Sequence, residues 1–345
     1  MSFSIAPFGQ TKAGQPVSIC RLTGPDCTIS VLTWGAALQS VIVPSAKGPL
    51  DVLLGCDTME DYEAQECYLG SLVGRVANRI AGGSFTLNKQ YYPLYRNSGI
   101  NTLHGGKIGW SHRVFTLLEQ TESSFVLGLE SPDGEEGFPG KIDLRVRYCL
   151  VPGGFALEWE GISDKPAPFA PSTHAYWNLA GHNSGDILKH QLQLFANQYT
   201  PVNEFLIPTG KIKSATGNPF DFTAAKEIGH DITSGYPQLV ITNGYDHNFI
   251  VNGEQDTLRP VARVFCEDSR ICMEQWSTLP GVQFYTGNFL LVRKAKGGTA
   301  YGKNEGFCLE PQYYPNFINC PSFPQGILQP GIPRCDRIEW RFACK

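Results

Sequence analysis

An alternation of apolar and polar side chains, with a period of two residues, constrains the fold of this chain more than any other feature. In the segment KIDLRVRYCLV, Ile142 and Leu144 fall on one face, and Asp143 and Arg145 on the other. This is the period of a strand buried on one side only, because successive side chains of a strand point to opposite faces. A second alternating run, FALEWE, follows Pro-Gly-Gly. The pattern therefore predicts an antiparallel hairpin over residues 141–161.

Similar short runs recur along the chain, and 37 glycines and 24 prolines separate them. They lie at residues 125–130, 190–196, 259–265, 270–276 and 282–287. No segment keeps a 3.6-residue period beyond about two turns, so little helix is expected. Many short strands with turn signals between them predict an all-β fold, a large antiparallel β-sandwich or barrel-like sheet assembly. Because no linker or repeat divides the chain, residues 1–345 are expected to form a single domain.

Charge and composition exclude several classes of partner. The formal net charge is -4, from 28 Lys and Arg against 32 Asp and Glu, which argues against binding to nucleic acid. No stretch has the roughly 18 apolar residues that a membrane-spanning helix needs, and no secretory signal is evident, so we expect no membrane partner. The eleven cysteines contain no Cys-x-x-Cys pair. They predict reduced thiols and a cytoplasmic protein.

Several polar clusters interrupt the strands and are not explained by packing. GRVANRIAGGSF places Asn78 and Arg79 between glycines that match no phosphate-binding loop, although a surface turn with a solvated arginine is an alternative. NTLHGG places His104 before two glycines that would let a ligand approach the main chain, although a structural role is the alternative for a lone histidine. FCLEPQYYPN sets a lone carboxylate, Glu310, among apolar residues.

A further cluster, PSTHAYWNLAG, offers an imidazole, a phenol, an indole and an amide within five residues, at His174, Tyr176, Trp177 and Asn178. Aromatic faces pack on pyranose rings and the polar groups bind hydroxyls, so this mixture is typical of a sugar site, with core packing as the alternative.

Asp246 and His247, in NGYDHNFIV, do not predict a metal site, because adjacent strand residues point to opposite faces. The other histidines provide no better set of metal ligands: His182, His190 and His230 are interpreted as turn and surface residues.

These clusters together resemble the aldose 1-epimerases, also called galactose mutarotases. The resemblance covers nearly the whole chain, through VLTWGAALQSVIVP, GRVANRIAGGSFTLN, NTLHGG, THAYWNLAG, IPTGKI, NPFDF, GYDHNFIV and EPQYYPNFIN in the family's order. It implies a galactose mutarotase-like β-supersandwich with the sugar in an open cleft. It also implies that Glu310 is the catalytic base and His174 the catalytic acid. Sugar contacts are implied for Asn78, Arg79, His104, Tyr176, Asp246 and Gln283.

The reaction that this resemblance implies, an isomerase reaction, interconverts the α and β anomers of a free hexose such as D-galactose or D-glucose. It needs two proton transfers, from the C1 hydroxyl and to the ring oxygen, and implies no cofactor and no metal. With ordinary pKa values of about 4.3 and 6.5, Glu310 is ionised at neutral pH but His174 is mostly neutral. We therefore expect a nearby carboxylate, Asp246 or Glu310, to raise the pKa of His174.

Three alternatives differ in what the site must contain. A hexose-6-phosphate 1-epimerase needs several converging cations, and the clusters supply Arg79 and little else. A glycoside hydrolase needs two carboxylates, for which Asp246 would have to join Glu310. A carbohydrate-binding protein without catalysis needs no such acid and base pair. The expected partner is a free aldohexose, and the expected assembly a monomer or weak homodimer; the preferred aldose is not predicted.

Overall fold

The alternating runs form antiparallel strands in the computed structural model, which describes residues 1–345. The predicted hairpin is confirmed, since β13 (Ile142–Val151) pairs with β14 (Gly154–Ser163) along its whole length. Ile142 and Leu144 are buried whereas Asp143 is exposed. The two-residue alternation therefore divides the core face of this hairpin from its solvent face.

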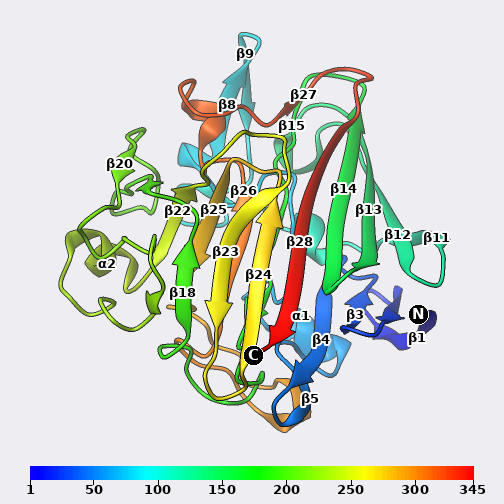
Figure 1. Ribbon diagram of the computed structural model, residues 1–345. Helices are drawn as coiled ribbons and strands as arrows, with labels where there is room; N and C mark the ends of the chain where they lie inside the picture. The colour runs from blue at the N-terminus through cyan, green and yellow to red at the C-terminus, as the bar shows by residue number, and fades with distance from the viewer.

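Most of the predicted runs lie in one nine-stranded sheet, which spans the front of the molecule in Figure 1. In spatial order its strands are β11 (Thr116–Gln120), β12 (Ser124–Ser131), β13, β14, β28 (Arg334–Cys344), β24 (Ile271–Ser277), β23 (Arg259–Phe265), β18 (Gln191–Leu194) and β21 (Lys226–Glu227). The C-terminal strand β28 lies in the middle of this sheet, between β14 and β24. The end of the chain therefore joins strands that are far apart in the sequence.

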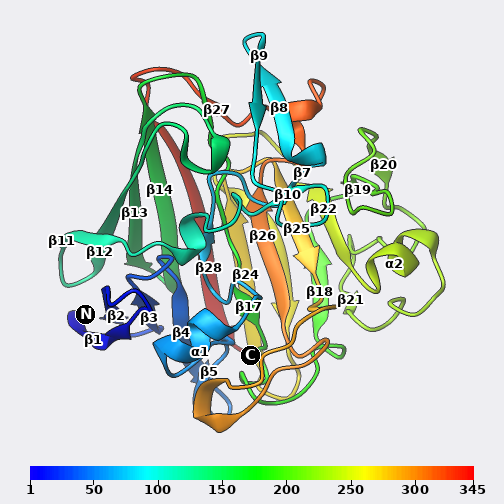
Figure 2. The same cartoon turned by 180° about the vertical axis from the view of Figure 1, so that it is seen from behind.

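A six-stranded sheet forms the second layer and is seen from its outer side in Figure 2. Its strands are, in spatial order, β17 (Tyr176–Trp177), β26 (Phe307–Gln312), β25 (Gly281–Tyr285), β22 (Asp246–Ile250), β19 (Gln198–Tyr199) and β20 (Lys213–Ser214). Several contacts join the layers. For example, the rings of Trp177 and Trp340 lie 5.8 Å apart, and Gln275 Nε2 donates to the carbonyl of Leu309 at 3.0 Å. The predicted large antiparallel β-sandwich is confirmed.

Smaller sheets surround these two layers. A five-stranded sheet contains β1 (Ser2–Gln10), β2 (Pro16–Thr23), β3 (Thr28–Leu32), β4 (Leu38–Ser45) and β5 (Gly48–Asp51). Four two-stranded ladders pair β6 (Leu72–Val73) with β16 (Ser172–Thr173), β7 (Arg79–Ile80) with β10 (Thr102–Leu103), β8 (Ser84–Leu87) with β9 (Gln90–Pro93), and β15 (Ala167–Pro168) with β27 (Ile327–Leu328). The ladders β6–β16 and β7–β10 hold loops that reach the candidate site.

Helix is minor, as predicted. The two α-helices, α1 (Met59–Ala64) and α2 (Pro237–Thr242), have six residues each. The 3-10 turns are η1 (Ala81–Gly83), η2 (Trp110–His112), η3 (Glu135–Gly137), η4 (Lys296–Gly298) and η5 (Phe317–Asn319). Neither α-helix has the length and apolar character required to cross a membrane.

Candidate active site

Polar residues lie on the outer face of the six-stranded sheet. They form rows across the strands, because residues directly opposite each other on paired strands point to the same side. One such row runs from Tyr176 through Cys308 and Tyr285 to Asp246. The next row runs from Glu310 through Gln283 to Asn248. Alternate positions, such as Phe307, Leu309 and Phe284, point the other way into the core. Two rows of cross-strand neighbours therefore bring together residues from four strands.

Two loops that cover this face are joined by two hydrogen bonds between Asn78 and His104. The amide of His104 donates to the carbonyl of Asn78 at 3.0 Å, and the amide of Asn78 donates to Nδ1 of His104 at 3.2 Å. Both residues have a positive φ, 61° at Asn78 and 49° at His104. Beside them Leu103 pairs with Arg79 in the β7–β10 ladder. This arrangement aims Arg79 and His104 at the polar face of the sheet.

Between the sheet and these loops lies a cavity of about 170 Å³. Seven of the eight predicted site residues line it: Asn78, Arg79, His104, His174, Tyr176, Asp246 and Glu310. Gln283, predicted as a sugar contact, is the exception. Its Nε2 donates to Oδ1 of Asp246 at 2.6 Å, and its Oε1 accepts from Gln312 at 3.2 Å. Gln283 therefore orients Asp246 from behind.

Glu310 and His174 border this cavity together. Oε1 of Glu310 lies 3.9 Å from Nε2 of His174, too far for a hydrogen bond, and Oε2 of Glu310 is buried without any partner. The imidazole is stacked between two phenol rings, with ring centroids 4.9 Å from Tyr176 and 5.9 Å from Tyr68. Stacking thus holds the imidazole in place, while the atoms of the two groups that face each other remain free for a ligand.

The ionisation of this pair is opposite to the expectation from sequence. Burial lowers the pKa of His174 to about 4, and no carboxylate overcomes it. Burial, followed by the charge of Asp246, raises the pKa of Glu310 well above its ordinary range. The prediction that a neighbouring carboxylate raises the pKa of His174 was therefore wrong. Desolvation disfavours both charged forms, so the proton of the pair rests on Glu310.

His104, His174 and Glu310 are close enough to suggest a metal site, since their ligand atoms lie within 4.8 Å of one another. The tautomer of His104 opposes this. Its Nδ1 accepts the amide proton of Asn78, so the neutral ring carries its own proton on Nε2 and has no lone pair left for an ion. The donor set fits an arrangement in which His104 donates a hydrogen bond to a ligand oxygen.

Three interpretations from sequence need correction. Gly105 and Gly106 do not open the main chain to a ligand: a Cβ on Gly105 would lie 1.8 Å from the carbonyl oxygen of Gly74, so that glycine permits chain packing. Trp177 points into the core, and Asn178 donates to the carbonyls of Gly185 and Glu305, at 2.8 and 3.1 Å.

The third correction concerns His190, which was interpreted as a turn or surface residue. It is buried, and its Nε2 accepts the amide proton of Leu179 at 3.0 Å.

Sequence reasoning missed several residues that line the cavity: Glu66, Cys67, Tyr68, Leu103, Tyr285 and Phe289. One of them carried a usable signal. Tyr285 follows Gln283 by two positions in an alternating run, and so shares its face of the strand. Tyr68 lies in a loop after α1 and has a positive φ of 56°, and nothing in its neighbourhood predicts contact with the imidazole of His174.

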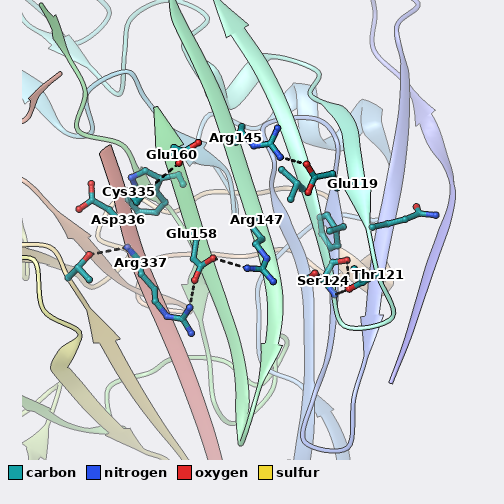
Figure 3. A pocket seen from close by; sticks show the side chains of 15 residues that line it. Glu119, Thr121, Ser124, Arg145, Arg147, Glu158, Glu160, Cys335, Asp336 and Arg337 are labelled. Atoms are coloured by element: carbon teal, nitrogen blue, oxygen red, sulfur yellow. Dashed lines mark hydrogen bonds and ion pairs between the residues drawn. The ribbon is translucent and has the colours of Figure 1, made fainter. Parts of the chain in front are cut away.

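A second hollow lies on the solvent face of the nine-stranded sheet, where the side chains form a ladder of opposite charges (Figure 3). Arg145 pairs with Glu119, and Glu158 bonds both Arg147 and Arg337. Most of the charges on the surface of this hollow are paired with one another, and no imidazole lies beside its carboxyl groups. The smaller cavity, where a carboxyl group and an imidazole face each other, is the better candidate.

Known proteins are similar to this chain in both sequence and fold. The sequence profile of the Aldose 1-epimerase family matches residues 18–335. Galactose mutarotase of Bos taurus is 39% identical, with 99% of this chain and 98% of that protein covered. Aldose 1-epimerase of Escherichia coli K12 is 34% identical over 96% of this chain and 97% of that protein.

Two solved structures superimpose closely. The GalM/aldose epimerase homologue from C. elegans has a TM-score of 0.88 at 26% identity, covering 95% of this chain and 99% of the other. Galactose 1-epimerase from Lactobacillus acidophilus NCFM has a TM-score of 0.86 at 26% identity and covers 99% of both chains.

Proposed function

Because the chain belongs to the aldose 1-epimerase family, a family of isomerases, we propose that it interconverts the α and β anomers of free hexoses such as D-galactose and D-glucose. The observation that carries the proposal is the placement of Glu310 and His174, 3.9 Å apart on one cavity with their facing atoms unbonded. At about 170 Å³, the cavity is smaller than the pockets of about 300–1,000 Å³ that hold drug-sized ligands, which suits a monosaccharide.

Glu310 acts as the base once a sugar is bound. No protein group donates a hydrogen bond to its Oε2, and a C1 hydroxyl that donates to this oxygen favours the ionised carboxylate. The proton of the pair then passes to Nε2 of His174, where the neighbouring negative charge stabilises the imidazolium. Sugar binding itself therefore produces the charged pair that the reaction uses.

Ring opening follows from this charged pair. Glu310 takes the proton of the C1 hydroxyl while His174 delivers its proton from Nε2 to the ring oxygen, so the C1–O5 bond breaks and an aldehyde forms. Rotation about C1–C2 presents the other carbonyl face, and the two transfers run backwards to close the ring. Glu310 and His174 end the turnover as they began it.

The remaining lining residues bind and orient the sugar. Arg79 and the Nε2 proton of His104 donate hydrogen bonds to sugar oxygens, and Asp246, held by Gln283 at 2.6 Å, accepts from hydroxyls. Tyr176 holds the imidazole of His174 by stacking at 4.9 Å and completes the wall.

Charge favours a neutral sugar over a sugar phosphate. Arg79 is the only lysine or arginine lining the cavity, against the carboxyl groups of Glu66, Asp246 and Glu310. A phosphate dianion would meet net negative surroundings there. The eleven free thiols support a location in a reducing compartment, and we place the protein in the cytoplasm on that ground.

Polarimetry of freshly dissolved α-D-galactose and α-D-glucose tests the proposal. The protein should speed the approach to the same final rotation, and Glu310→Gln should lower kcat by about 10² to 10⁴ while sugar still binds. A glycoside hydrolase would leave the mutarotation rate unchanged, and a binding protein would be indifferent to the substitution. Either outcome would reject the proposed function.

A further inference from the structure

Strand β26 contacts both nitrogens of the His174 imidazole. Cys308 and Glu310 are two residues apart on this strand and so point to the same face. Sγ of Cys308 lies 3.5 Å from Nδ1 of His174, while Oε1 of Glu310 lies 3.9 Å from Nε2. One strand thus places a thiol behind the ring and a carboxyl group in front of it. Nothing in the proposed reaction uses the thiol.

The protonation states of the thiol and of the imidazole decide which of the two groups donates the hydrogen bond between them. Burial raises the pKa of Cys308 well above its ordinary range, so the sulfur carries its proton and no charge. An uncharged thiol donates weakly to a bare Nδ1 or accepts weakly from a protonated one. Oε1 of Glu310 faces Nε2 at 3.9 Å, and burial raises the pKa of this carboxyl group, so it keeps its proton. A second proton on Nε2 would oppose it, which places the proton of the neutral ring on Nδ1.

We propose that Cys308 is a positioning residue whose sulfur accepts the Nδ1 proton of His174, so that Nε2 is the nitrogen that takes up and releases protons. The catalytic meaning of this inference rests on the proposed function, but the position of the proton does not. The arrangement leaves the Nε2 lone pair of neutral His174 directed at Glu310.

The two histidines of the cavity then carry opposite tautomers. His104 has its proton on Nε2, because Nδ1 accepts from the amide of Asn78 at 3.2 Å, and it can only donate to a sugar oxygen. His174 has its proton on Nδ1 and exchanges protons through Nε2. An uncharged partner behind His174 also differs from the carboxylate that stabilises the imidazolium in serine proteases. It leaves the imidazolium a stronger acid toward the ring oxygen.

Nuclear magnetic resonance of the ¹⁵N-histidine-labelled protein tests the tautomers directly, at a pH near 7.5 and without sugar. Long-range ¹H–¹⁵N spectra distinguish a protonated from an unprotonated ring nitrogen, and the His174→Gln variant assigns the signals. We expect a protonated Nδ1 on His174 and a protonated Nε2 on His104, which serves as the internal control. A protonated Nε2 on His174 would overturn the proposal.

Substitutions at Cys308 test the role of the sulfur. Cys308→Ala removes the acceptor and should lower kcat by about ten- to a hundredfold with little change in KM. Cys308→Asn provides an uncharged acceptor and should restore most of kcat. Cys308→Asp places a carboxylate behind the ring, which favours the imidazolium. The acidic limb of the kcat/KM profile, expected near the His174 pKa of about 4, should therefore lie at higher pH in this variant than in the wild type.

Cys20→Ala is the matched control, since Cys20 is an equally buried free thiol on β2 that lies outside the cavity. Its kcat and its His174 signals should match the wild type. Wild-type kcat in Cys308→Ala, or a kcat loss in Cys308→Asn as large as in Cys308→Ala, would overturn the role of the sulfur. If His174→Gln and Glu310→Gln kept full activity, the proposed function would fail instead, while the tautomer result would stand.

Discussion

At the scale of single residues, the environment rather than the residue type sets the chemistry of the cavity. Glu310 and His174 have ordinary pKa values that would make the carboxyl group the charged partner at neutral pH. Burial favours the uncharged form of both groups: it lowers the pKa of His174 to about 4 and raises that of Glu310. The last proton of the free pair is therefore lost from Glu310, and the basic limb of kcat/KM should report this carboxyl group.

The pH profile of Asp246→Asn tests that assignment. The negative charge of Asp246 helps to raise the pKa of Glu310, so its removal lowers that pKa and should move the basic limb of kcat/KM to lower pH. Glu66→Gln is the matched control, because Glu66 lines the same cavity but does not contribute to the raised pKa of Glu310. A basic limb that stays in place in Asp246→Asn would assign it to another group.

At the scale of elements, short ladders and glycine turns position the loops over the sheet. His104 follows β10 and is followed in turn by Gly105, whose φ is 92°. That glycine lets the loop touch the main chain at Gly74, and the contact holds the imidazole over the cavity. The loop that carries His104 therefore depends on close packing between two stretches of main chain.

Gly105→Ala should disturb both stability and sugar binding. The added Cβ would lie 1.8 Å from the carbonyl oxygen of Gly74, so the loop must shift, at a cost of more than about 2 kcal/mol in the free energy of unfolding and with a higher KM. Gly99→Ala controls for backbone strain alone: its φ is 60° but its Cβ meets open space, so about 1–2 kcal/mol is expected. Urea denaturation of the two variants makes the comparison, and equal losses would contradict the prediction.

At the scale of the whole molecule, the sandwich buries polar groups at a cost that depends on pH. Asp336 on β28 is buried opposite Trp159 on β14. Its Oδ2 makes no hydrogen bond, and its nearest cation is Nε of Arg334 at 3.6 Å, which opposes the effect of burial only in part. Burial raises its pKa from the ordinary 3.8 to about 6. A carboxyl group whose pKa is raised on folding stabilises the protein below its unfolded pKa, and this contribution is lost as the pH rises through the folded pKa.

Asp336→Asn should therefore become more stable than the wild type as the pH rises from about 3.8 to about 6, and keep a constant advantage above that. The window of about two pH units corresponds to a gain of ~3 kcal/mol in the free energy of unfolding. Urea titrations at a series of pH values measure it. Asp143→Asn, an exposed carboxylate on β13, should show no comparable gain, and a pH-independent difference for Asp336→Asn would refute the account.

The sequence by itself determined most of the strands and singled out the proposed acid and base pair. Period two is a local property, so the hairpin of β13 and β14 could be predicted from its own residues. Glu310 and His174 could be found because segments spread along the chain resemble one family in its order.

Only the tertiary structure decided how these residues behave. It assigned Gln283 to the support of Asp246, brought Tyr68 and Cys308 against His174, and reversed the expected ionisation of the pair. The reason is physical: which groups meet, and how much water each one loses, depends on segments far apart in the chain. Neither the contacts of a side chain nor its loss of water can be deduced from its neighbours in the sequence.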